Sequence, residues 1–395
     1  MTKTLTTPML QGSIRAIASK SMAHRLMICA ALSQTPTELI CSTTSRDIEA
    51  TKACLAAMRN DTSPLRCGES GSTLRFLLPV AAALGLETAF LMEGRLPERP
   101  LAPLDAQLRA HGAMVRQEGE LLYVGGRLQP GDYTLPGGIS SQFISGLLFA
   151  LPLLDKPSIL TVTGKTESEP YIHMTLSALR QFGVEIGVKD HVYRIPACSY
   201  QSPGSAVVEG DWSNAAFWLC AGALAGPVTV TGLDGSSLQG DKEILSLLAR
   251  FGARCSQNGD SFTVAADTLR GIDIDASAIP DLVPVLAVVA AKAEGETRIF
   301  NAGRLRLKES DRIESVCQML TNIGAQVTAL PDGMIIHGGR PLAGGSVDSC
   351  GDHRIAMAAA VAAAVCQGPV TVTGAQAVEK SYPHFWEDLK TLTRT

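Results

Sequence analysis

The decapeptide RLRLKESDRI (304–313) concentrates six ionisable side chains in a chain of which only 18% is charged. The apolar residues that follow recur at helical spacing: Ile313, Val316, Cys317 and Leu320. We therefore expect a helix there, with Ser310 as its N-cap. Lys308 and Glu309 would lie in the loop before it, with Asp311 and Arg312 in its first turn. A carboxylate beside these cations suits proton transfer or mutual orientation; the alternative is a surface ion-pair network.

A second charged helix start lies in ASKSMAHRLMICAAL (18–32), where Ser19 is a plausible N-cap. Lys20 and Ser21 would occupy the first turn, with Arg25 on the same face as Ser21. A cation is disfavoured at the positive end of a helix dipole, so Lys20 needs a compensating partner. A bound anion would be such a partner. The alternative is an exposed lysine that the helix tolerates.

Two further segments place small or hydroxyl residues where a helix begins. In CGESGSTLR (67–75), Gly71 and Ser72 let backbone N–H groups approach a phosphate closely, and Arg75 follows three residues later. The segment GGISSQF (137–143) offers neutral donors instead: Ser140, Ser141 and Gln142. Each taken singly is compatible with an ordinary serine N-cap after a glycine turn. Their recurrence in one chain favours anion binding.

Three more segments carry basic residues. CGDHRIAMAAAVAAAV (350–365) begins an alanine-rich helix with Asp352, His353 and Arg354. Alanine on every face implies tight burial, so these polar residues are expected to point into a cleft. Arg99 precedes a proline and should be extended, and Lys380 lies in a short loop. The alternative for each is a solvated surface charge.

The elements that must position these residues recur with a period of about seventy residues. A helix-like stretch ending in glycine and followed by an alternating segment occurs four times, at Gly112, Gly183, Gly252 and Gly324. The spacings are 71, 69 and 72 residues. A β-branched stretch closed by glycine keeps the same period, at Gly94, Gly164, Gly232, Gly303 and Gly374. The two markers predict helices with glycine-capped ends and short strands with glycine turns.

Alternation of helix and strand within each repeat predicts an α/β protein. The simplest division of 395 residues gives two domains of three repeats each. The stretch CSYQSPGSAVVEGD (198–211) is the best internal boundary. A strand expected over residues 3–11 could belong to either half. A single stacked array resembling a solenoid is the alternative architecture.

Composition narrows the function classes. A hydrophobic content of 46% supports real cores, and the net charge of −4 argues against a nucleic-acid surface. The ten cysteines form no CxxC and no cluster with histidine at metal spacing, so reduced thiols are expected. The N-terminal stretch lacks the pattern of a secretory signal, and the most apolar run is short of a membrane span. We expect a cytoplasmic protein without metal, membrane or nucleic-acid partner.

Motifs along nearly the whole chain resemble the 5-enolpyruvylshikimate-3-phosphate synthase family of 3-phosphoshikimate 1-carboxyvinyltransferases. They read KSMAHR, GESGSTLR, PERP, SSQF, SEPYIHMTL, IPDLVP, LKESDR, DHRIAM and EKSYPHF, in this order. The resemblance implies the two-domain enolpyruvyl transferase fold, with three βαβαββ units per domain in pseudo-threefold symmetry. It also implies an active site in the cleft between the domains. We expect one domain over 14–210, on the shikimate 3-phosphate side, and the other over 1–13 plus 211–395, on the phosphoenolpyruvate side.

The family transfers the enolpyruvyl group of phosphoenolpyruvate to the 5-hydroxyl of shikimate 3-phosphate, in the pathway to chorismate and aromatic amino acids. Transfer proceeds by addition and elimination through a tetrahedral intermediate and releases phosphate. The resemblance implies contacts to shikimate 3-phosphate from Ser21, Arg25, Ser140, Ser141, Gln142, Ser168, Tyr171, Asp281 and Lys308. It implies contacts to phosphoenolpyruvate from Lys20, Gly71, Arg99, Gln142, Arg312, Arg354 and Lys380, with His353 counted among the substrate-binding residues.

For the chemistry, the resemblance assigns Asp281 to orienting or deprotonating the 5-hydroxyl. Our interpretation gives Glu309 the proton exchanged with the methylene carbon, and Lys20 charge pairing or a second acid–base role. Which of Lys20, Asp281 and Glu309 performs each proton transfer is left open at this point. The resemblance implies no cofactor and a monomer. Glu69 and Arg304 depart from the family's pattern, since asparagine is frequent at both positions. Gly71 leaves room for glyphosate, an inhibitor of the family, so sensitivity is expected.

Two rival functions remain open at this point. The sister enzyme that enolpyruvylates UDP-N-acetylglucosamine shares the fold and the donor. It typically has a cysteine in the loop that here reads MEGRLPERP (92–100), and an asparagine at the position of Ser21. A non-catalytic repeat scaffold could bind an anionic partner with the same cations, but it would not need Asp281 or Glu309.

Overall fold

The computed structural model describes residues 1–6 and 9–392, and the chain divides into two compact units. The C-terminal unit comprises Met1–Ser19 and Glu209–Thr395, and the N-terminal unit comprises Lys20–Val208. The boundaries expected from the sequence, 13/14 and 210/211, therefore differ from the observed 19/20 and 208/209. Pairing explains the first difference, because a strand over Gly12–Arg15 joins a sheet of the C-terminal unit.

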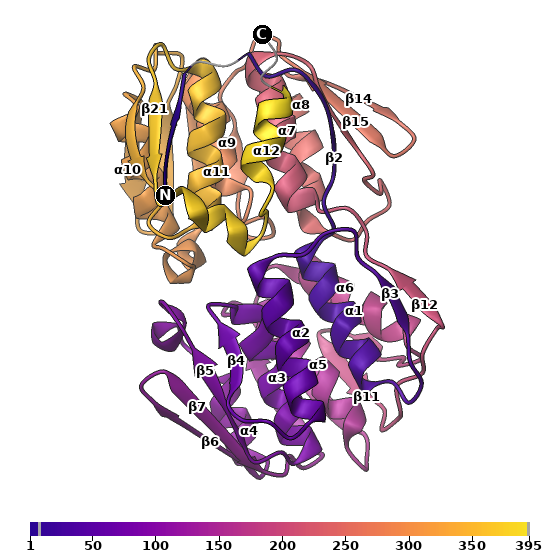
Figure 1. Ribbon diagram of the computed structural model, residues 1–395. Helices are drawn as coiled ribbons and strands as arrows, with labels where there is room; N and C mark the ends of the chain where they lie inside the picture. Colours follow the sequence, from indigo (N-terminus) through magenta and orange to yellow (C-terminus); the bar gives the residue numbers. More distant parts are fainter. Residues whose placement is uncertain (7–8, 393–395) are drawn as a thin grey trace. The chain divides into compact units, whose positions relative to one another are not determined.

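The opening segment corrects the expectation of one strand over residues 3–11. It forms two strands, β1 (Thr2–Leu5) and β2 (Gly12–Arg15), and positions 7–8 lie outside the described residues. β1 pairs antiparallel with β21 (Val370–Thr373), beside which it lies in Figure 1, and β2 pairs parallel with β13 (Val228–Thr231). Both strands thus belong to the C-terminal unit, as the family resemblance implied for this segment.

One sheet topology recurs through both units. In four of the sheets, two parallel strands are extended by two antiparallel strands, which is the βαβαββ pattern. Two such repeats lie in the N-terminal unit. The first contains β4 (Leu65–Gly68), α3 (Gly71–Leu84), β5 (Thr88–Met92), α4 (Leu104–Ala110), β6 (Ala113–Glu118) and β7 (Leu121–Gly126). The second contains β8 (Asp132–Pro136), α5 (Ser141–Ala150), β9 (Ser158–Thr163), α6 (Glu169–Gln181), β10 (Gly187–Lys189) and β11 (Val192–Ile195).

The other two complete repeats lie in the C-terminal unit. One joins β2 and β13 to α7 (Trp212–Ala225), α8 (Ile244–Phe251), β14 (Arg254–Asn258) and β15 (Ser261–Ala265). The other contains β16 (Asp273–Asp275), α9 (Val283–Lys292), β17 (Glu296–Phe300), α10 (Arg312–Asn322), β18 (Gln326–Leu330) and β19 (Gly333–His337).

Each unit also has one shortened repeat. The N-terminal unit has α1 (Lys20–Leu32), β3 (Glu38–Ile40), α2 (Arg46–Arg59) and β12 (Ser205–Val207). The C-terminal unit has β20 (Gly345–Asp348), α11 (His353–Ala362), β21 and α12 (Phe385–Leu392), with β1 at the sheet edge. Short 3-10 helices complete the described elements: η1 (Leu96–Glu98), η2 (Leu151–Leu153), η3 (Gly240–Glu243), η4 (Gly303–Leu307), η5 (Ala363–Val365) and η6 (Ala375–Lys380).

The glycine markers have the conformations that their spacing predicted, with one exception. The four glycines after helices all have positive φ, from 76° at Gly183 to 111° at Gly252. The same holds for the glycines after strands except Gly303; there Asn301 takes the left-handed conformation, with φ 56°. Asparagine is among the residues that tolerate this region, so the turn forms two residues earlier than predicted.

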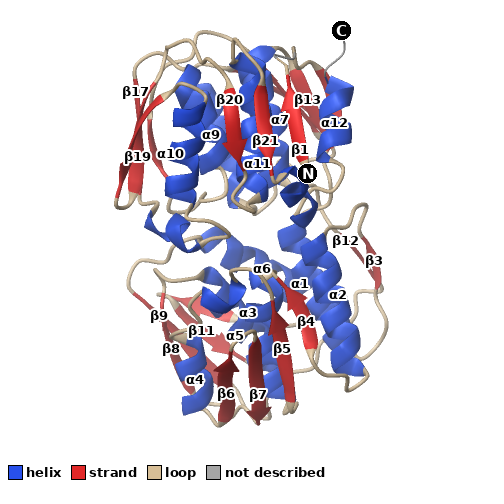
Figure 2. Ribbon diagram, turned by 60° about the vertical axis from the view of Figure 1, so that its left-hand side comes forward, coloured by secondary structure: helices blue, strands red, loops and turns tan. Residues whose placement is uncertain are grey.

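Nearly continuous burial of the central helices accounts for their apolar composition. In the C-terminal unit α7, α9 and α11 pack on one another, and every residue of α11 is buried. Its alanines permit the close approach that larger side chains would prevent. In the N-terminal unit α3 packs on α5, and in both units helices lie against the sheets (Figure 2). Among the described residues, every helix is too short or too polar to cross a membrane.

Candidate active site

The charged segment that opens α10 lies in the C-terminal unit, and its cap differs from the sequence expectation. Asp311, rather than Ser310, is the N-cap, because its carboxylate accepts a hydrogen bond from the backbone N of Glu314 (3.1 Å). Ser310 instead donates to Asp352 (3.3 Å). Arg312 is the first residue of the helix, so Lys308 and Glu309 precede it as expected.

Arg312 is the centre of this cluster, with a side chain only 1% exposed. Its guanidinium donates to three carboxylates, each at 2.7 Å: Nε to Asp352, Nη1 to Asp281 and Nη2 to Glu309. Burial would lower the pKa of Arg312, but the three carboxylates outweigh it and raise the pKa above its usual value. Arg312 therefore stays charged and holds Asp281 beside Glu309.

Asp281 is held by further cations. Arg354 donates from Nη2 to its carboxylate (2.9 Å), and Nζ of Lys308 lies 3.8 Å away. Burial would raise the pKa of Asp281, yet Arg354, Lys308 and Arg312 together hold it well below its usual range. Asp281 is consequently an anion at neutral pH. It is suited to accepting a hydrogen bond and is a weak base in the free protein.

Lys308 has the opposite perturbation. Burial lowers the pKa of Lys308 to about 8, an effect to which Arg312 and Arg304 contribute and which Asp281 and Glu309 oppose. Its side chain is still about a quarter exposed (26%), so the ammonium remains accessible to a ligand.

Helix α11 and the η6 segment add the remaining predicted residues of this unit. Asp352 caps α11 by accepting from the backbone N of Arg354 (2.9 Å), which fixes the start of the helix beside Arg312. His353 is buried next to Asp352, 3.8 Å from its carboxylate. Lys380 is buried at the end of η6.

Aromatic contacts hold the chain after Lys380. Tyr382 donates to Asp388 (2.6 Å) and accepts from Trp218 Nε1 (3.1 Å). These bonds fix the η6 segment against α7 and α12.

Asp241, a buried acid on η3, was not predicted from the sequence. Ser213 donates to its carboxylate. Burial and the charge of Asp281 raise the pKa of Asp241 to about 7, while Arg354 and the Ser213 hydrogen bond lower it. Asp241 therefore belongs to the electrostatic environment of Asp281. Its segment, LQGDKE, does place three consecutive charged residues just before helix α8, so this charge pattern was the signal that could have found it.

The N-terminal unit holds the other predicted residues. Lys20 begins α1 and forms an ion pair with Asp47 (Nζ to Oδ2, 2.9 Å), a carboxylate in the first turn of α2. Asp47 thus compensates for the lysine at the positive end of the helix. The sequence did not single out Asp47, because nothing in its local pattern shows that α2 begins beside α1.

Arg25 is buried and held at three points. Its Nη1 donates to the Ser21 carbonyl (2.6 Å), its Nη2 to the Tyr171 carbonyl (2.8 Å) and its Nε to Thr175 (2.9 Å). Burial lowers the pKa of Arg25 to about 10, so it remains charged at neutral pH. The structure therefore groups Ser21, Arg25 and Tyr171. Ser168 precedes α6 in the left-handed conformation, with φ 53°.

Gly71 lies where two guanidinium groups converge. A Cβ added at Gly71 would lie 2.6 Å from Nη1 of Arg75 and 2.8 Å from Nη1 of Arg99. Gln142 connects this point to α5, since it accepts from Arg75 (3.3 Å) and donates to Ser72 (2.9 Å). Gly71, Arg99 and Gln142 are therefore neighbours.

The helix beginning at Ser141 has a serine cap, which was the alternative given for this segment. Ser140 is its N-cap and accepts from the backbone N of Gln142 (3.3 Å), and Ser141 is buried. The two departures from the family pattern have local partners. Glu69 lies against Gly94, where an added Cβ would be 2.7 Å from its carboxylate, and Arg304 donates to the Ser277 carbonyl (2.9 Å).

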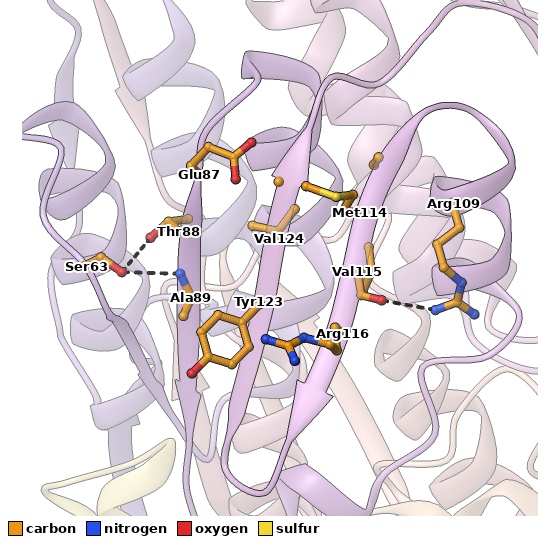
Figure 3. Close-up of a pocket in the computed structure, with 12 residues that line it drawn as sticks. Ser63, Glu87, Thr88, Ala89, Arg109, Met114, Val115, Arg116, Tyr123 and Val124 are labelled. Carbon is orange, nitrogen blue, oxygen red and sulfur yellow. Dashed lines mark hydrogen bonds between the residues drawn. The ribbon is translucent and has the colours of Figure 1, made fainter.

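A separate hollow lies on the sheet of β4, β5, β6 and β7 (Figure 3). Its lining includes Glu87, Arg116 and Tyr123, with the Arg116 guanidinium 5.2 Å from the centre of the Tyr123 ring. None of the predicted site residues lines it. It is distinct from both clusters described above.

The predicted residues thus divide between the two units. Those of the C-terminal unit centre on Arg312 and Asp281, and those of the N-terminal unit form the groups around Lys20, Arg25 and Gly71, which we call the N-terminal cluster. Both combine several cations with hydroxyl or amide donors, which suits binding of phosphate and carboxylate groups. The C-terminal cluster adds carboxylates held beside those cations, which suits proton transfer. Among the residues that the structure describes, no group of histidine, cysteine or acidic side chains is arranged to hold a metal ion.

Comparisons with known proteins agree with this chemistry. A family model described as EPSP synthase (3-phosphoshikimate 1-carboxyvinyltransferase) matches residues 6–64 and 60–389. A 3-phosphoshikimate 1-carboxyvinyltransferase from Clostridium acetobutylicum is 42% identical over 97% of this chain and 95% of its own length. An EPSP synthase structure from Acinetobacter baumannii is similar, with TM-score 0.81 and 25% identity over 100% of this chain and 98% of that one. The enolpyruvyl transferase NikO from Streptomyces tendae shares the fold, with TM-score 0.77 and 20% identity over 99% and 97% of the two chains.

Proposed function

We propose how the two clusters act, from the premise that this chain belongs to the EPSP synthase (3-phosphoshikimate 1-carboxyvinyltransferase) family and transfers the enolpyruvyl group of phosphoenolpyruvate to shikimate 3-phosphate. Both substrates are multiply charged anions. The cations of the two clusters offset the repulsion between them and hold them in reacting geometry.

Shikimate 3-phosphate is assigned to the donors grouped around Arg25 and α5, together with Lys308 and Asp281. Its contacts in this proposal are Ser21, Arg25, Ser140, Ser141, Gln142, Ser168, Tyr171, Asp281 and Lys308. Supporting this assignment, Arg25 is fixed by three hydrogen bonds and is charged at neutral pH. A guanidinium held in this way loses little conformational entropy when it binds a phosphate.

Phosphoenolpyruvate is assigned to the cations around Gly71 and to the basic residues of the C-terminal cluster. Its contacts in this proposal are Lys20, Gly71, Arg99, Gln142, Arg312, Arg354 and Lys380, with His353 at the same site. The convergence of Arg75 and Arg99 on Gly71 supports this assignment. Arg312 already bonds three carboxylates, so its role toward the substrate is added to its role in holding the acids.

The reaction requires three proton movements. In the addition, the 5-oxygen bonds to C2 of phosphoenolpyruvate, the hydroxyl loses its proton and the C3 methylene gains one to become a methyl group. In the elimination, the methyl group loses a proton, the C2–C3 double bond reforms and the bond from C2 to the phosphate oxygen breaks. We assign Asp281 to orienting the 5-hydroxyl and receiving its proton as the bond to C2 forms; that proton then passes to solvent or to the departing phosphate. Glu309 exchanges the proton with C3, and Lys20 serves as charge partner or second acid–base group.

The observation that carries this proposal is the guanidinium of Arg312, which holds Asp281 and Glu309 at 2.7 Å each in one buried cluster. A scaffold that only binds anions would gain nothing from carboxylates at this position. They would repel the ligand and weaken the cations. Paired acids are instead what the addition and elimination require.

Phosphate release tests the proposal. The native protein is incubated with phosphoenolpyruvate and either shikimate 3-phosphate or UDP-N-acetylglucosamine, with each substrate alone as the control. We expect release only with phosphoenolpyruvate and shikimate 3-phosphate together. Phosphate release with UDP-N-acetylglucosamine but not with shikimate 3-phosphate would refute the proposed acceptor. Absence of release with both acceptors would support a non-catalytic scaffold.

We further propose a cytoplasmic monomer that needs no cofactor. All ten cysteines are free thiols in the structure. Light scattering in solution tests the oligomeric state, and a mass well above 41.6 kDa would refute a monomer.

A further inference from the structure

A chain of buried hydrogen bonds connects three helices of the N-terminal unit. It begins at His24 Nδ1 on α1, which lies 2.7 Å from the hydroxyl of Thr51 on α2. The Thr51 hydroxyl lies 2.6 Å from that of Thr73 on α3, and Thr73 donates to the Ser70 hydroxyl (2.7 Å). All four side chains are at most 1% exposed. None of these four residues has a role in the reaction proposed above.

The direction of these bonds follows from the proton count. Thr73 donates its only hydroxyl proton to Ser70, so the Thr73 oxygen must accept the hydrogen bond from Thr51. Thr51 then has no proton left for His24, and Nδ1 of His24 must be the donor. Burial lowers the pKa of His24 to about 3, so the ring is neutral and carries its one proton on Nδ1. Its Nε2 is then an unprotonated acceptor, and it has no hydrogen-bond partner among the described residues.

The chain ends at the N-cap of α3. Ser70 accepts from the backbone N of Thr73 (3.3 Å) as well as from its hydroxyl. This bond occupies one of the donors that a helix start leaves open. The backbone N–H groups of Gly71 and Ser72 are the first-turn donors that remain for an anion. Fixing the Ser70 hydroxyl therefore fixes the turn that presents Gly71.

A second buried chain ends at Arg25 instead. Thr175 donates to the Tyr171 carbonyl (3.1 Å), so it accepts from both Arg25 Nε (2.9 Å) and Ser145 (2.7 Å). Thr175 and Ser145 are both 0% exposed. Within residues 1–6 and 9–392, no hydrogen bond joins the two hydroxyl chains.

We propose that these two chains are positioning devices, one for each substrate, and this inference rests on the proposed function. The chain from His24 through Thr51 and Thr73 sets the turn at Gly71 for phosphoenolpyruvate. The chain from Ser145 through Thr175 sets the Arg25 guanidinium for shikimate 3-phosphate. None of these residues contacts a substrate, and each acts through the group at the end of its chain.

A pair of matched variants separates the two devices. Thr51→Val and Thr175→Val each replace a buried hydroxyl by a methyl group of nearly the same shape. Thr51→Val should raise KM for phosphoenolpyruvate by at least about fivefold, the order expected from an unmet buried hydrogen bond, and leave KM for shikimate 3-phosphate within about twofold. Thr175→Val should do the reverse. Thr51→Ser and Thr175→Ser keep the hydroxyl and should restore both values.

Melting temperatures are measured on all four variants, so that general destabilisation is recognised. Equal changes in both KM values, or no change in a folded valine variant, would overturn the inference. If Thr51→Val does not fold, Ser70→Ala breaks the same chain at its other end and must show the same selective effect. Failure of the proposed function would give a different result, because the wild-type protein would then show no turnover with shikimate 3-phosphate. In that case, calorimetry of shikimate 3-phosphate binding to Thr175→Val would still test the second chain.

Discussion

The alkaline limit of activity should be set by Lys308, whose pKa burial lowers to about 8 from a usual 10.5. In the proposed site its ammonium binds shikimate 3-phosphate, so the neutral amine loses that contact. With a pKa near 8, about one-tenth of the protein has the charged lysine at pH 9 and about one-hundredth at pH 10. We therefore expect kcat/KM for shikimate 3-phosphate to fall about tenfold per pH unit above pH 8, because this ratio reports groups of the free enzyme.

The lowered pKa of Lys308 should make the protein more stable, not less, as the pH rises. This difference helps to separate a loss of substrate binding from unfolding. Between pH 8 and 10.5 the unfolded chain binds the proton of Lys308 more tightly than the native protein does. The contribution of Lys308 to native stability therefore rises with pH through that window. The rise is at most about 3 kcal/mol, and solvent screening of the partly exposed side chain reduces it. A fall in activity above pH 8 from Lys308 is thus not a consequence of unfolding.

The assay is a pH profile of kcat/KM for the native protein, Lys308→Arg and Asp281→Asn. Arginine stays charged through this range, so Lys308→Arg should lose the alkaline limb, whatever its absolute activity. Asp281→Asn removes a charge that raises the lysine pKa, so any residual activity should fall at a lower pH. A native profile that is flat to pH 10, or an arginine variant that falls at the same pH as the native protein, would refute the reasoning.

Two further substitutions test other contacts. Gly71→Ala would place a methyl group 2.6 Å from Arg75 and 2.8 Å from Arg99. It should therefore raise KM for phosphoenolpyruvate about tenfold or more and weaken inhibition by glyphosate, which should be competitive with phosphoenolpyruvate in the native protein; unchanged values would contradict the placement of that substrate. Asp352→Ala would leave the buried Arg312 short of one carboxylate and α11 without its cap. Urea unfolding should show a loss of roughly 3–5 kcal/mol, and a loss below about 1 kcal/mol would show that the ion pair contributes little.

Much of the fold could be predicted because each repeat has local sequence markers, namely the glycines at the ends of its helices and strands. A glycine in the left-handed region after a helix or strand is a short-range requirement, so its seventy-residue spacing survives in the sequence. The opening segment was predicted less well, because extended residues look alike whichever sheet they join. The break into β1 and β2 depends on two different partners, β21 and β13, far along the chain.

The candidate site shows the same limit. Charge patterns near helix starts were enough to single out Lys20, Arg25 and Arg312. Their partners Asp47, Thr175 and Asp352 lie on other helices. Of these, only Asp352 stood out in the sequence, because it begins the DHR motif. The choice between Ser310 and Asp311 as cap was also beyond a local pattern, since both residue types cap helices well and the backbone geometry decided between them.

The central claim is that an acid at Glu309 exchanges a proton with the methylene carbon during addition and elimination. Running the reaction in heavy water tests it most directly. If C3 becomes a methyl group and then loses one of its three hydrogens, deuterium must enter the vinyl group of the product. Glu309→Gln should reduce turnover by about 10²–10⁴ while its circular dichroism and melting temperature stay close to those of the native protein. Mass spectrometry of the native product should show vinyl deuterium. A native product without it would contradict the mechanism, and a glutamine variant with native rate and deuterium content would contradict the assignment of Glu309.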